Sequence, residues 1–208
     1  MENEQKAELP VHKPDIKEKI FFFLSGLLVS VPFTLFFSGF TDTLCVALPQ
    51  FLGSLCSTVL FAPFIEEFAK VFPLFYRHGE TQRSLVNLAI LTGLGFGITE
   101  LALYVLVLGA PIVARVPGVI FHASSASITA YGISLKKPVV FYLIAVSLHL
   151  ANNFFALLTN ALSFVPVLTV LVITYFLAWR LYNQTSEKVV VQSLRPAVVR
   201  FYRFLTGP

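Results

Sequence analysis

Residues 20–40 read IFFFLSGLLVSVPFTLFFSGF and contain no charged side chain. A helix needs roughly 20 consecutive apolar residues to cross the hydrocarbon core of a bilayer, and this run supplies them. The run is long for the apolar region of a signal peptide, and no A-x-A cleavage pattern follows it. We therefore expect a retained membrane-spanning helix at residues 20–40.

The composition of the whole chain extends this interpretation. Of the 208 residues, 56% are hydrophobic and only 12% are charged, whereas a soluble domain carries about 25% charged residues. Too few polar side chains remain to cover a water-facing surface, so a soluble globular enzyme is excluded, and so is a disordered chain. The net charge of +4 does not indicate a nucleic-acid partner, because membrane proteins gather Lys and Arg in cytoplasmic loops whatever their function.

Five further apolar segments follow the first one. They are residues 44–75, 85–108, 112–135, 139–158 and 164–181. Residues 44–75 are too many for one straight crossing and are interrupted by prolines, so they form either one kinked span or a span plus a re-entrant segment. The pattern predicts an all-α, polytopic membrane helix bundle with about six transmembrane helices.

The basic residues indicate the topology. With six spans and both termini in the cytoplasm, all of the 15 Lys and Arg residues except Lys70 and Arg115 lie on the cytoplasmic side. We therefore expect a multi-pass protein of the cell membrane, with a cytoplasmic tail at residues 1–19, a transmembrane domain at residues 20–182 and a basic tail at residues 183–208. This last tail mixes apolar and basic residues, so it either lies on the inner leaflet or frays.

The two cysteines, Cys45 and Cys56, both have apolar neighbours in the sequence. Their number and spacing match neither a disulfide framework nor a CxxC metal pattern. The simplest interpretation is that they serve as small apolar residues.

Several ionisable residues fall inside the predicted spans. Each such group at the centre of a membrane costs about 2.5–3.5 kcal/mol on insertion scales, so these residues indicate a functional site. Their depths, counted from the cytoplasmic ends at about 1.5 Å per residue, are roughly 15–24 Å, which predicts a shared, water-accessible cavity. The residues are Glu66, Glu67, Lys70, Glu100, His122 and His149.

The spacing of these residues separates their expected tasks. Glu66 and Lys70 are four residues apart, so on a helix they share a face and can form an ion pair. Glu67 points about 100° away from Glu66, which suits structural support better than direct participation. The same four-residue spacing recurs in two later spans, at Phe96 and Glu100 and at His149 and Asn153.

Other polar or small residues in the spans have simpler interpretations. Arg115 lies near the outer end of its span, so we expect its side chain to extend toward the membrane surface. Gly93, Gly95 and Gly97 lie in an apolar span with no preceding strand, which favours close helix packing over a phosphate-binding loop. The H-E-x-x-H motif is absent, although two histidines and a glutamate could still bind zinc.

Four motifs in chain order resemble those of PrsW-type intramembrane proteases. Residues 66–70, EEFAK, resemble the EExxK motif, and residues 95–100, GFGITE, resemble the second motif, FxxxE. Residues 121–126, FHASSA, resemble the third, a histidine followed by small residues, and residues 149–153, HLANN, resemble the fourth, HxxxN. Relatives of this family include the CAAX prenyl endopeptidases, bacteriocin-processing enzymes and the multi-pass scaffold subunit of γ-secretase. The resemblance covers residues 63–153.

The resemblance implies a glutamate-dependent peptidase that uses no metal and no other cofactor. Lys70 and Phe96 would support the reaction. The residues to which the resemblance assigns catalytic tasks are Glu66, Glu67, Glu100, His122, His149 and Asn153.

Peptide hydrolysis needs a base for water, a donor for the leaving amine and a group that stabilises the oxyanion. By resemblance, Glu66 is the base, and His149 and Asn153 donate to the oxyanion. His122 would orient or protonate, and Glu100 would position water or a histidine. The CAAX branch has a histidine where this chain has Glu100, so the residue that partners Glu66 stays open, with His122 as one candidate.

The implied substrate is a membrane-tethered protein cut in or near the bilayer, such as an anti-sigma factor. Two other classes of function remain. A non-catalytic member could scaffold membrane partners, although it would have no need for the acidic pair. A small transporter or proton-coupled channel could also use intramembrane Glu and His, but no inverted repeat is evident in the sequence. A zinc-dependent form of the protease would be sensitive to a chelator.

Overall fold

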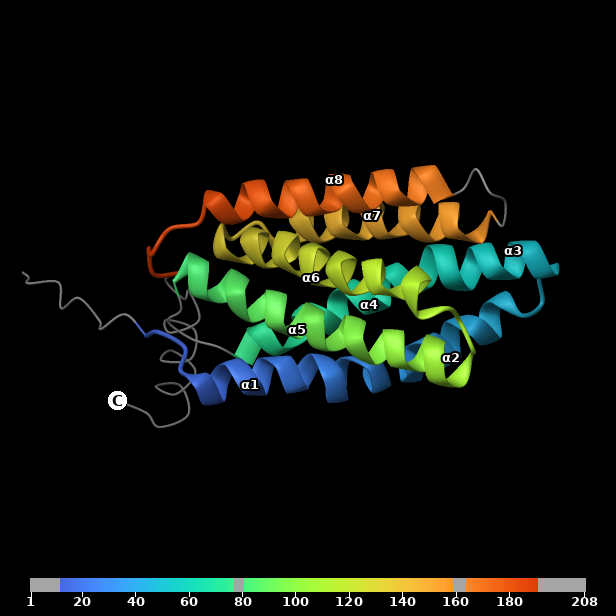
Figure 1. Cartoon of the computed structure of the whole chain (residues 1–208), viewed down its shortest axis with the longest axis horizontal. Helices are drawn as coiled ribbons and strands as arrows, with labels where there is room; N and C mark the ends of the chain where they lie inside the picture. Colours follow the sequence, from blue (N-terminus) through green and yellow to red (C-terminus); the bar gives the residue numbers. More distant parts are fainter. Residues whose placement is uncertain (1–11, 77–80, 159–163, 191–208) are drawn as a thin grey trace, which may run out of the picture.

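The computed structural model describes residues 12–76, 81–158 and 164–190. Within these ranges the regular elements are helices, apart from an isolated bridge between Thr81 and Val189. The helices run roughly along one long axis and form a bundle (Figure 1). The predicted all-α, polytopic helix bundle is confirmed.

The first two spans form a hairpin. Helix α1 (Ile16–Leu24), the π-helical turn η1 (Ser25–Ser30) and α2 (Val31–Cys45) follow one another without a break. Asp15 caps α1, because its side chain accepts a hydrogen bond from the Glu18 amide. The chain then turns, and the second span runs back through α3 (Gln50–Ser54), η2 (Leu55–Phe61), α4 (Ala62–Val71) and the 3₁₀ turn η3 (Phe72–Tyr76). Residues 50–76 are therefore one irregular crossing rather than a span plus a separate re-entrant segment.

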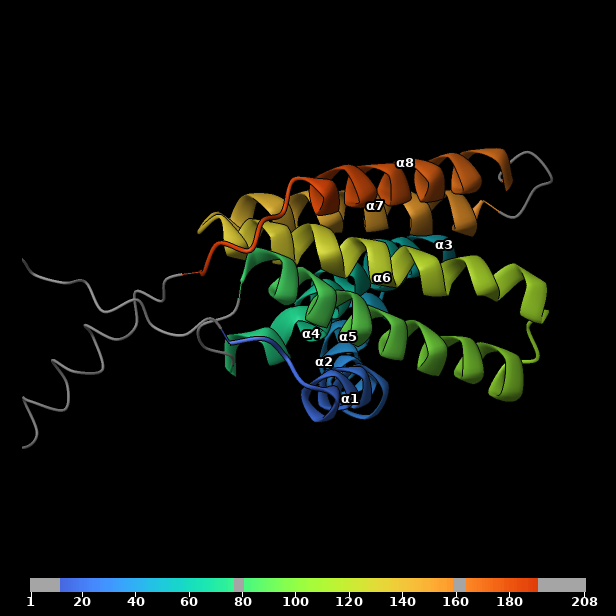
Figure 2. The same cartoon turned by 60° about the vertical axis from the view of Figure 1, so that its left-hand side comes forward.

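The remaining spans follow the predicted ranges closely. They are α5 (Gln82–Ala102) with the π-helical turn η4 (Leu103–Val107), α6 (Ile112–Ser134), α7 (Pro138–Leu157) and α8 (Phe164–Asn183). Five helical segments of the described chain are long and apolar enough to cross a membrane, and α6 is not among them. Helix α6 is nevertheless 23 residues long and lies between α5 and α7 (Figures 1 and 2). Its residues 121–132 are buried, so neighbouring helices take the place of lipid.

Two glycines of α5 allow the close approach of α6. A Cβ atom on Gly93 would lie 2.5 Å from the carbonyl oxygen of His122, and one on Gly97 would lie 2.7 Å from the Cα of Val119. On the opposite face of α5, a Cβ on Gly95 would lie 2.2 Å from the carbonyl oxygen of Phe23. The prediction of close helix packing at these glycines is confirmed.

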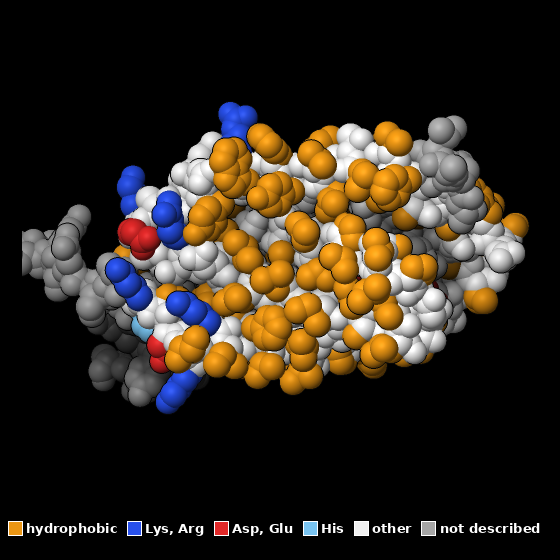
Figure 3. Space-filling view, viewed as in Figure 1, with side chains coloured by type: hydrophobic (Ala, Val, Ile, Leu, Met, Phe, Trp, Pro, Cys, Tyr) orange, Lys and Arg blue, Asp and Glu red, His pale blue; other side chains and the backbone are white. Residues whose placement is uncertain are grey.

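The two ends of the bundle differ in chemistry. The start of α1 and the end of α8 lie at the same end (Figure 1), and Lys and Arg side chains gather there (Figure 3). We call it the basic end. The rest of the surface in this view is largely hydrophobic, as lipid contact requires (Figure 3). The orientation of the termini stays a prediction, and the predicted basic tail lies mostly outside the described residues.

The opposite end, which we call the cysteine end, corrects one expectation. Cys45 and Cys56 form a disulfide with 5.7 Å between their Cα atoms. The prediction treated both as unpaired members of one apolar run. The chain turns between them at residues 46–49, which brings the end of α2 against η2. The disulfide closes the tip of the first hairpin.

Candidate functional site

Helix α4 carries the acidic motif into the middle of the bundle. Pro63 stands in its first turn, where a missing amide proton costs nothing. Glu67 and Lys70 are fully buried on the side of the helix that faces α6 and α7, whereas 13% of the Glu66 side chain is exposed. The two adjacent glutamates therefore lie in different environments, as their angular separation predicted.

Lys70 pairs with Glu67 and not with Glu66, which corrects the predicted pairing. Its Nζ lies 2.5 Å from Oε1 of Glu67, 3.0 Å from Oγ of Ser125 and 3.0 Å from Nδ1 of His122. An ammonium group has three N–H donors, so these acceptors use all of them. The i,i+3 spacing places Glu67 and Lys70 on one face of the helix, as i,i+4 would do for Glu66 and Lys70. The direction of the Lys70 side chain is set by its acceptors on α6.

His122 of α6 is held at both ring nitrogens. Nδ1 faces the Lys70 ammonium at 3.0 Å, and Nε2 lies 2.7 Å from Oε2 of Glu100. Because an ammonium group can only donate, Nδ1 must accept, and the ring proton sits on Nε2 and points at the carboxylate. Glu100 thus orients a histidine, one of the two tasks expected of it.

Arg115 joins the site, which corrects the expectation that it extends to the membrane surface. Its Nη2 lies 3.2 Å from Oε1 of Glu100, and its Cζ lies 3.5 Å from the centroid of the Tyr104 ring. Its Nε is buried and has no hydrogen-bond partner among the described residues. Arg115 precedes His122 by seven residues, two helical turns, so the sequence spacing already placed both on one face.

His149 of α7 is the imidazole that faces Glu66. Its Nδ1 lies 2.8 Å from Oε1 of Glu67, and its Nε2 lies 3.6 Å from Oε2 of Glu66. The Glu67 carboxylate accepts a hydrogen bond from Nδ1–H, so in the neutral ring Nε2 presents its lone pair to Glu66. Oε2 of Glu66 is buried and has no hydrogen-bond partner among the described residues. A separation of 3.6 Å is too long for a direct hydrogen bond.

Aromatic rings enclose the two histidines. The ring of Phe96 lies 4.9 Å from that of His122, and the ring of Phe121 lies 5.1 Å from that of His149. The two imidazole rings are themselves 5.4 Å apart. Phe96 also lies under the Lys70 ammonium, 5.4 Å from its ring centroid. The predicted support by Phe96 thus corresponds to a contact with both a histidine and the buried cation.

Asn153 lies one turn beyond His149 on α7, but its amide points elsewhere. Nδ2 donates to the backbone carbonyl of Thr58 in η2, at 3.0 Å. No polar contact joins Asn153 to the site in the described part of the chain. Its predicted role at the oxyanion stays a prediction. Sequence reasoning assigned no role to Ser125, although it lies in the third motif, and missed Tyr104, for which the only signal was its position one turn from Glu100.

The polar side chains from four helices form one continuous chain of contacts. The order of the chain is Arg115, Glu100, His122, Lys70, Glu67, His149 and Glu66. The inner members are at most 4% exposed, whereas the side chains of Glu66, Glu100 and Arg115 are 13%, 20% and 29% exposed. We call these three residues the open side of the site. These three residues are the members of the contact chain that are accessible from outside the bundle.

A comparison with known protein families finds a match over most of the chain. The sequence pattern of the PrsW family, described as intramembrane metalloproteases, matches residues 16–180. The chain belongs to the PrsW family. No curated protein and no solved structure matches the chain. The match includes every residue of the contact chain, so the buried charges belong to the part of the molecule that the PrsW family shares.

The description of the PrsW family as metalloproteases raises the question of a metal. Glu66, His122 and His149 offer ligand atoms within 4.8 Å of one another, a donor set that zinc accepts. Both nitrogens of His122, however, already have partners, and one of these is the Lys70 ammonium at 3.0 Å. A divalent cation in contact with His122 would repel that ammonium. As arranged, the three residues do not fit a metal unless Lys70 withdraws.

Proposed function

We propose that this chain is an intramembrane endopeptidase that hydrolyses a peptide bond of a membrane-tethered protein with Glu66 as the general base. One observation carries the proposal. Oε2 of Glu66 is buried, has no hydrogen-bond partner among the described residues and lies 3.6 Å from Nε2 of His149. A carboxylate oxygen without a donor, next to an imidazole, favours a donor molecule beside it, and water is the donor that peptide hydrolysis consumes.

The residues would divide the reaction as follows. Glu66 takes a proton from water as the water oxygen attacks the carbonyl carbon, and the proton passes to the leaving nitrogen as the C–N bond breaks. Glu67 holds the Nδ1 proton of His149 and so keeps Nε2 available. Before it reaches the leaving nitrogen, this proton passes from Glu66 to Nε2 of His149, which then donates a hydrogen bond to the oxyanion. Asn153 would add a second donor by exchanging the Thr58 carbonyl for the substrate.

Cleavage by purified, reconstituted protein tests the base. Wild-type protein and the Glu66→Gln variant are mixed in liposomes with a panel of single-span membrane proteins, and mass spectrometry identifies new termini. We expect cleavage by the wild type and a loss of about 10²–10⁴-fold in the variant, the usual contribution of a general base. Asp42→Asn, an equal charge change at an exposed position of α2, is the matched control. Full cleavage by Glu66→Gln would remove Glu66 from the mechanism.

A metal-dependent protease is the second candidate, because three ligand atoms converge and the family description names a metal. The same liposomes are assayed after treatment with a chelator, and the metal content of the purified protein is measured. We expect cleavage to survive and the protein to contain less than one equivalent of metal. Loss of cleavage with recovery on added zinc would show that cleavage depends on a metal ion.

Two non-proteolytic functions are tested in the same preparation. A scaffold would bind single-span proteins without producing new termini. A transporter or proton-coupled channel would show flux across the liposome membrane and little sensitivity to Asn153→Ala. The proposal expects new termini and no flux that depends on Glu66.

A further inference from the structure

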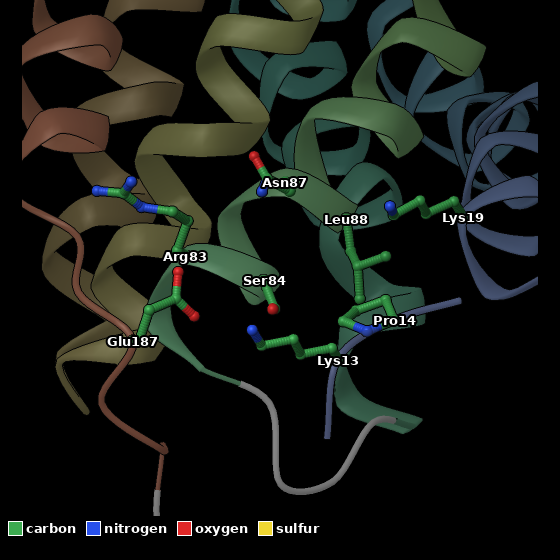
Figure 4. A pocket seen from close by; sticks show the side chains of 8 residues that line it. All are labelled: Lys13, Pro14, Lys19, Arg83, Ser84, Asn87, Leu88 and Glu187. Atoms are coloured by element: carbon green, nitrogen blue, oxygen red, sulfur yellow. The ribbon is translucent and has the colours of Figure 1, made fainter. Parts of the chain in front are cut away.

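A small cavity lies at the basic end, away from the contact chain. Its volume is about 200 Å³. The polar residues that line it are Lys13, Lys19, Arg83, Ser84, Asn87 and Glu187. They come from the segment that leads into α1 and the first turn of α1, from the first two turns of α5 and from the segment after α8 (Figure 4).

The wall after α8 is fixed by backbone hydrogen bonds to the start of α5. The Gln82 amide donates to the Lys188 carbonyl at 3.0 Å, and the Arg83 amide donates to the Ser186 carbonyl at 3.2 Å. The Arg83 guanidinium turns away from the cavity, toward Thr185, where Nη2 donates to the carbonyl at 2.9 Å (Figure 4). Three segments that are distant in the sequence thus build a defined cavity.

The cavity presents unpaired hydrogen-bond donors. Neither Lys13 nor Lys19 forms an ion pair with any described residue, and both extend toward α5 (Figure 4). The side-chain amide of Asn87 has no hydrogen-bond partner within the described ranges and is exposed. Because the Arg83 guanidinium points away, the charges that face the cavity are those of Lys13, Lys19 and Glu187, a net charge of +1. Such a lining attracts an anion.

The position of the cavity specifies the source of the anion. Helix α1 begins beside it at Ile16, and the side chains of Ile16 and Ile20 are 68% and 50% exposed. The cavity mouth therefore lies where the apolar, lipid-facing surface meets the basic end. Phosphate groups of membrane lipids occupy this level, and basic pockets between helices at the cytoplasmic side bind anionic head groups.

We propose that this cavity binds the phosphate group of an anionic glycerophospholipid. Lys13 and Lys19 donate to the phosphate oxygens, with Asn87 as a third donor. The Glu187 carboxylate on the opposite wall accepts a hydrogen bond from a head-group hydroxyl, which a glycerol head group has and a choline head group lacks. The bound lipid joins α1, α5 and the segment after α8 through one ligand.

Thermal unfolding of the purified full chain in detergent tests the proposal. The probes are phosphatidylglycerol, phosphatidylcholine and inorganic phosphate. We expect phosphatidylglycerol to raise the unfolding temperature, and the other two to have little effect. In the Lys13→Gln/Lys19→Gln variant, half-maximal stabilisation should need about tenfold more phosphatidylglycerol, because two charge-assisted hydrogen bonds are lost.

A matched variant separates a site from general surface charge. Lys136→Gln/Lys137→Gln removes the same charge from exposed positions before α7, outside the cavity, and should bind phosphatidylglycerol like the wild type. Equal weakening in the two double variants would overturn the proposal in favour of diffuse attraction. Stabilisation by inorganic phosphate alone, to the same extent as by the lipid, would overturn the lipid assignment. Both variants change exposed side chains, and circular dichroism before lipid addition confirms their fold.

Discussion

The two sides of the contact chain carry similar charges in different surroundings. Glu67, Lys70 and His122 form the closed side, where the side chains are at most 4% exposed and every donor has an acceptor. On the open side, Glu66 and Arg115 are partly exposed, and each has a buried polar atom without a hydrogen-bond partner among the described residues. Oε2 of Glu67 on the closed side also has none, but its side chain is fully buried. Exposure therefore separates the two sides: buried ion pairs hold helices in place, and partly exposed groups are accessible to a substrate. The comparison predicts that the closed side governs stability and the open side governs cleavage.

The neighbouring glutamates give the sharpest test of this division. Glu67→Gln leaves the buried Lys70 ammonium without its countercharge, so we expect the free energy of unfolding to fall by about 3–5 kcal/mol. Glu66→Gln should leave stability nearly unchanged. Thermal unfolding of both variants in one detergent measures the difference. The double variant Glu67→Gln/Lys70→Met removes both charges and should recover part of the loss; no recovery would contradict the ion-pair explanation.

A substitution that separates α5 from α6 next to the closed side should have the next largest effect on stability. Gly93→Ala places a Cβ atom 2.5 Å from the His122 carbonyl oxygen, which forces α5 and α6 apart and costs about 1–3 kcal/mol. Cleavage should fall as well, because His122 moves. Gly39→Ala is the control, since no atom lies within 4 Å of the added Cβ. Similar behaviour of the two variants in unfolding and cleavage would argue against a tight α5–α6 contact.

Arg115 on the open side should affect cleavage more than stability. Its ion pair with Glu100 is partly exposed, so Arg115→Gln should cost no more than about 1 kcal/mol of stability. Loss of the pair frees Glu100, and we expect kcat/KM to fall about fivefold to tenfold, equivalent to ~1 kcal/mol in the barrier. Arg180→Gln, at an exposed position of α8, should change neither kcat/KM nor stability. A large drop in unfolding temperature for Arg115→Gln would place this residue on the structural side.

The smallest expected effect lies at the edge of α4. The hydroxyl of Tyr142 on α7 donates to the carbonyl of Phe64 at 2.7 Å, close to Glu66 in the sequence. Tyr142→Phe should lower the free energy of unfolding by about 0.5–1.5 kcal/mol. Tyr175→Phe, at an exposed position of α8, should change nothing measurable. Cleavage assays of both would show whether this bond also positions Glu66.

Most of the fold could be predicted because membrane spans leave a strong signal. The six helical segments agree with the apolar runs to within a few residues, with two exceptions: the first extends beyond residues 20–40 to Ile16–Cys45, and the second begins at Gln50 rather than at residue 44. The disulfide could not be predicted, because an apolar run gives little sign of the turn at residues 46–49 that brings Cys45 to Cys56. Composition also understates α6, whose neighbours are other helices.

The candidate site was predicted at the level of its members and not of its pairs. Burial cost alone selected Glu66, Lys70 and His149, since a membrane tolerates such residues only for a reason. Helical spacing alone could not show whether Lys70 pairs with Glu67 at i,i+3 or with Glu66 at i,i+4, because both spacings place the partner on the same face as Lys70. The choice depends on Ser125 and on the other acceptors of α6, which only the packing of separate helices reveals.

The disulfide between Cys45 and Cys56 has a mechanical consequence for substrate entry. It fastens the tip of the first hairpin, so α2 and the span that carries Glu66 cannot spread apart at the cysteine end. Under the proposed function, a transmembrane substrate segment therefore has to separate another pair of helices to reach Glu66 from the lipid.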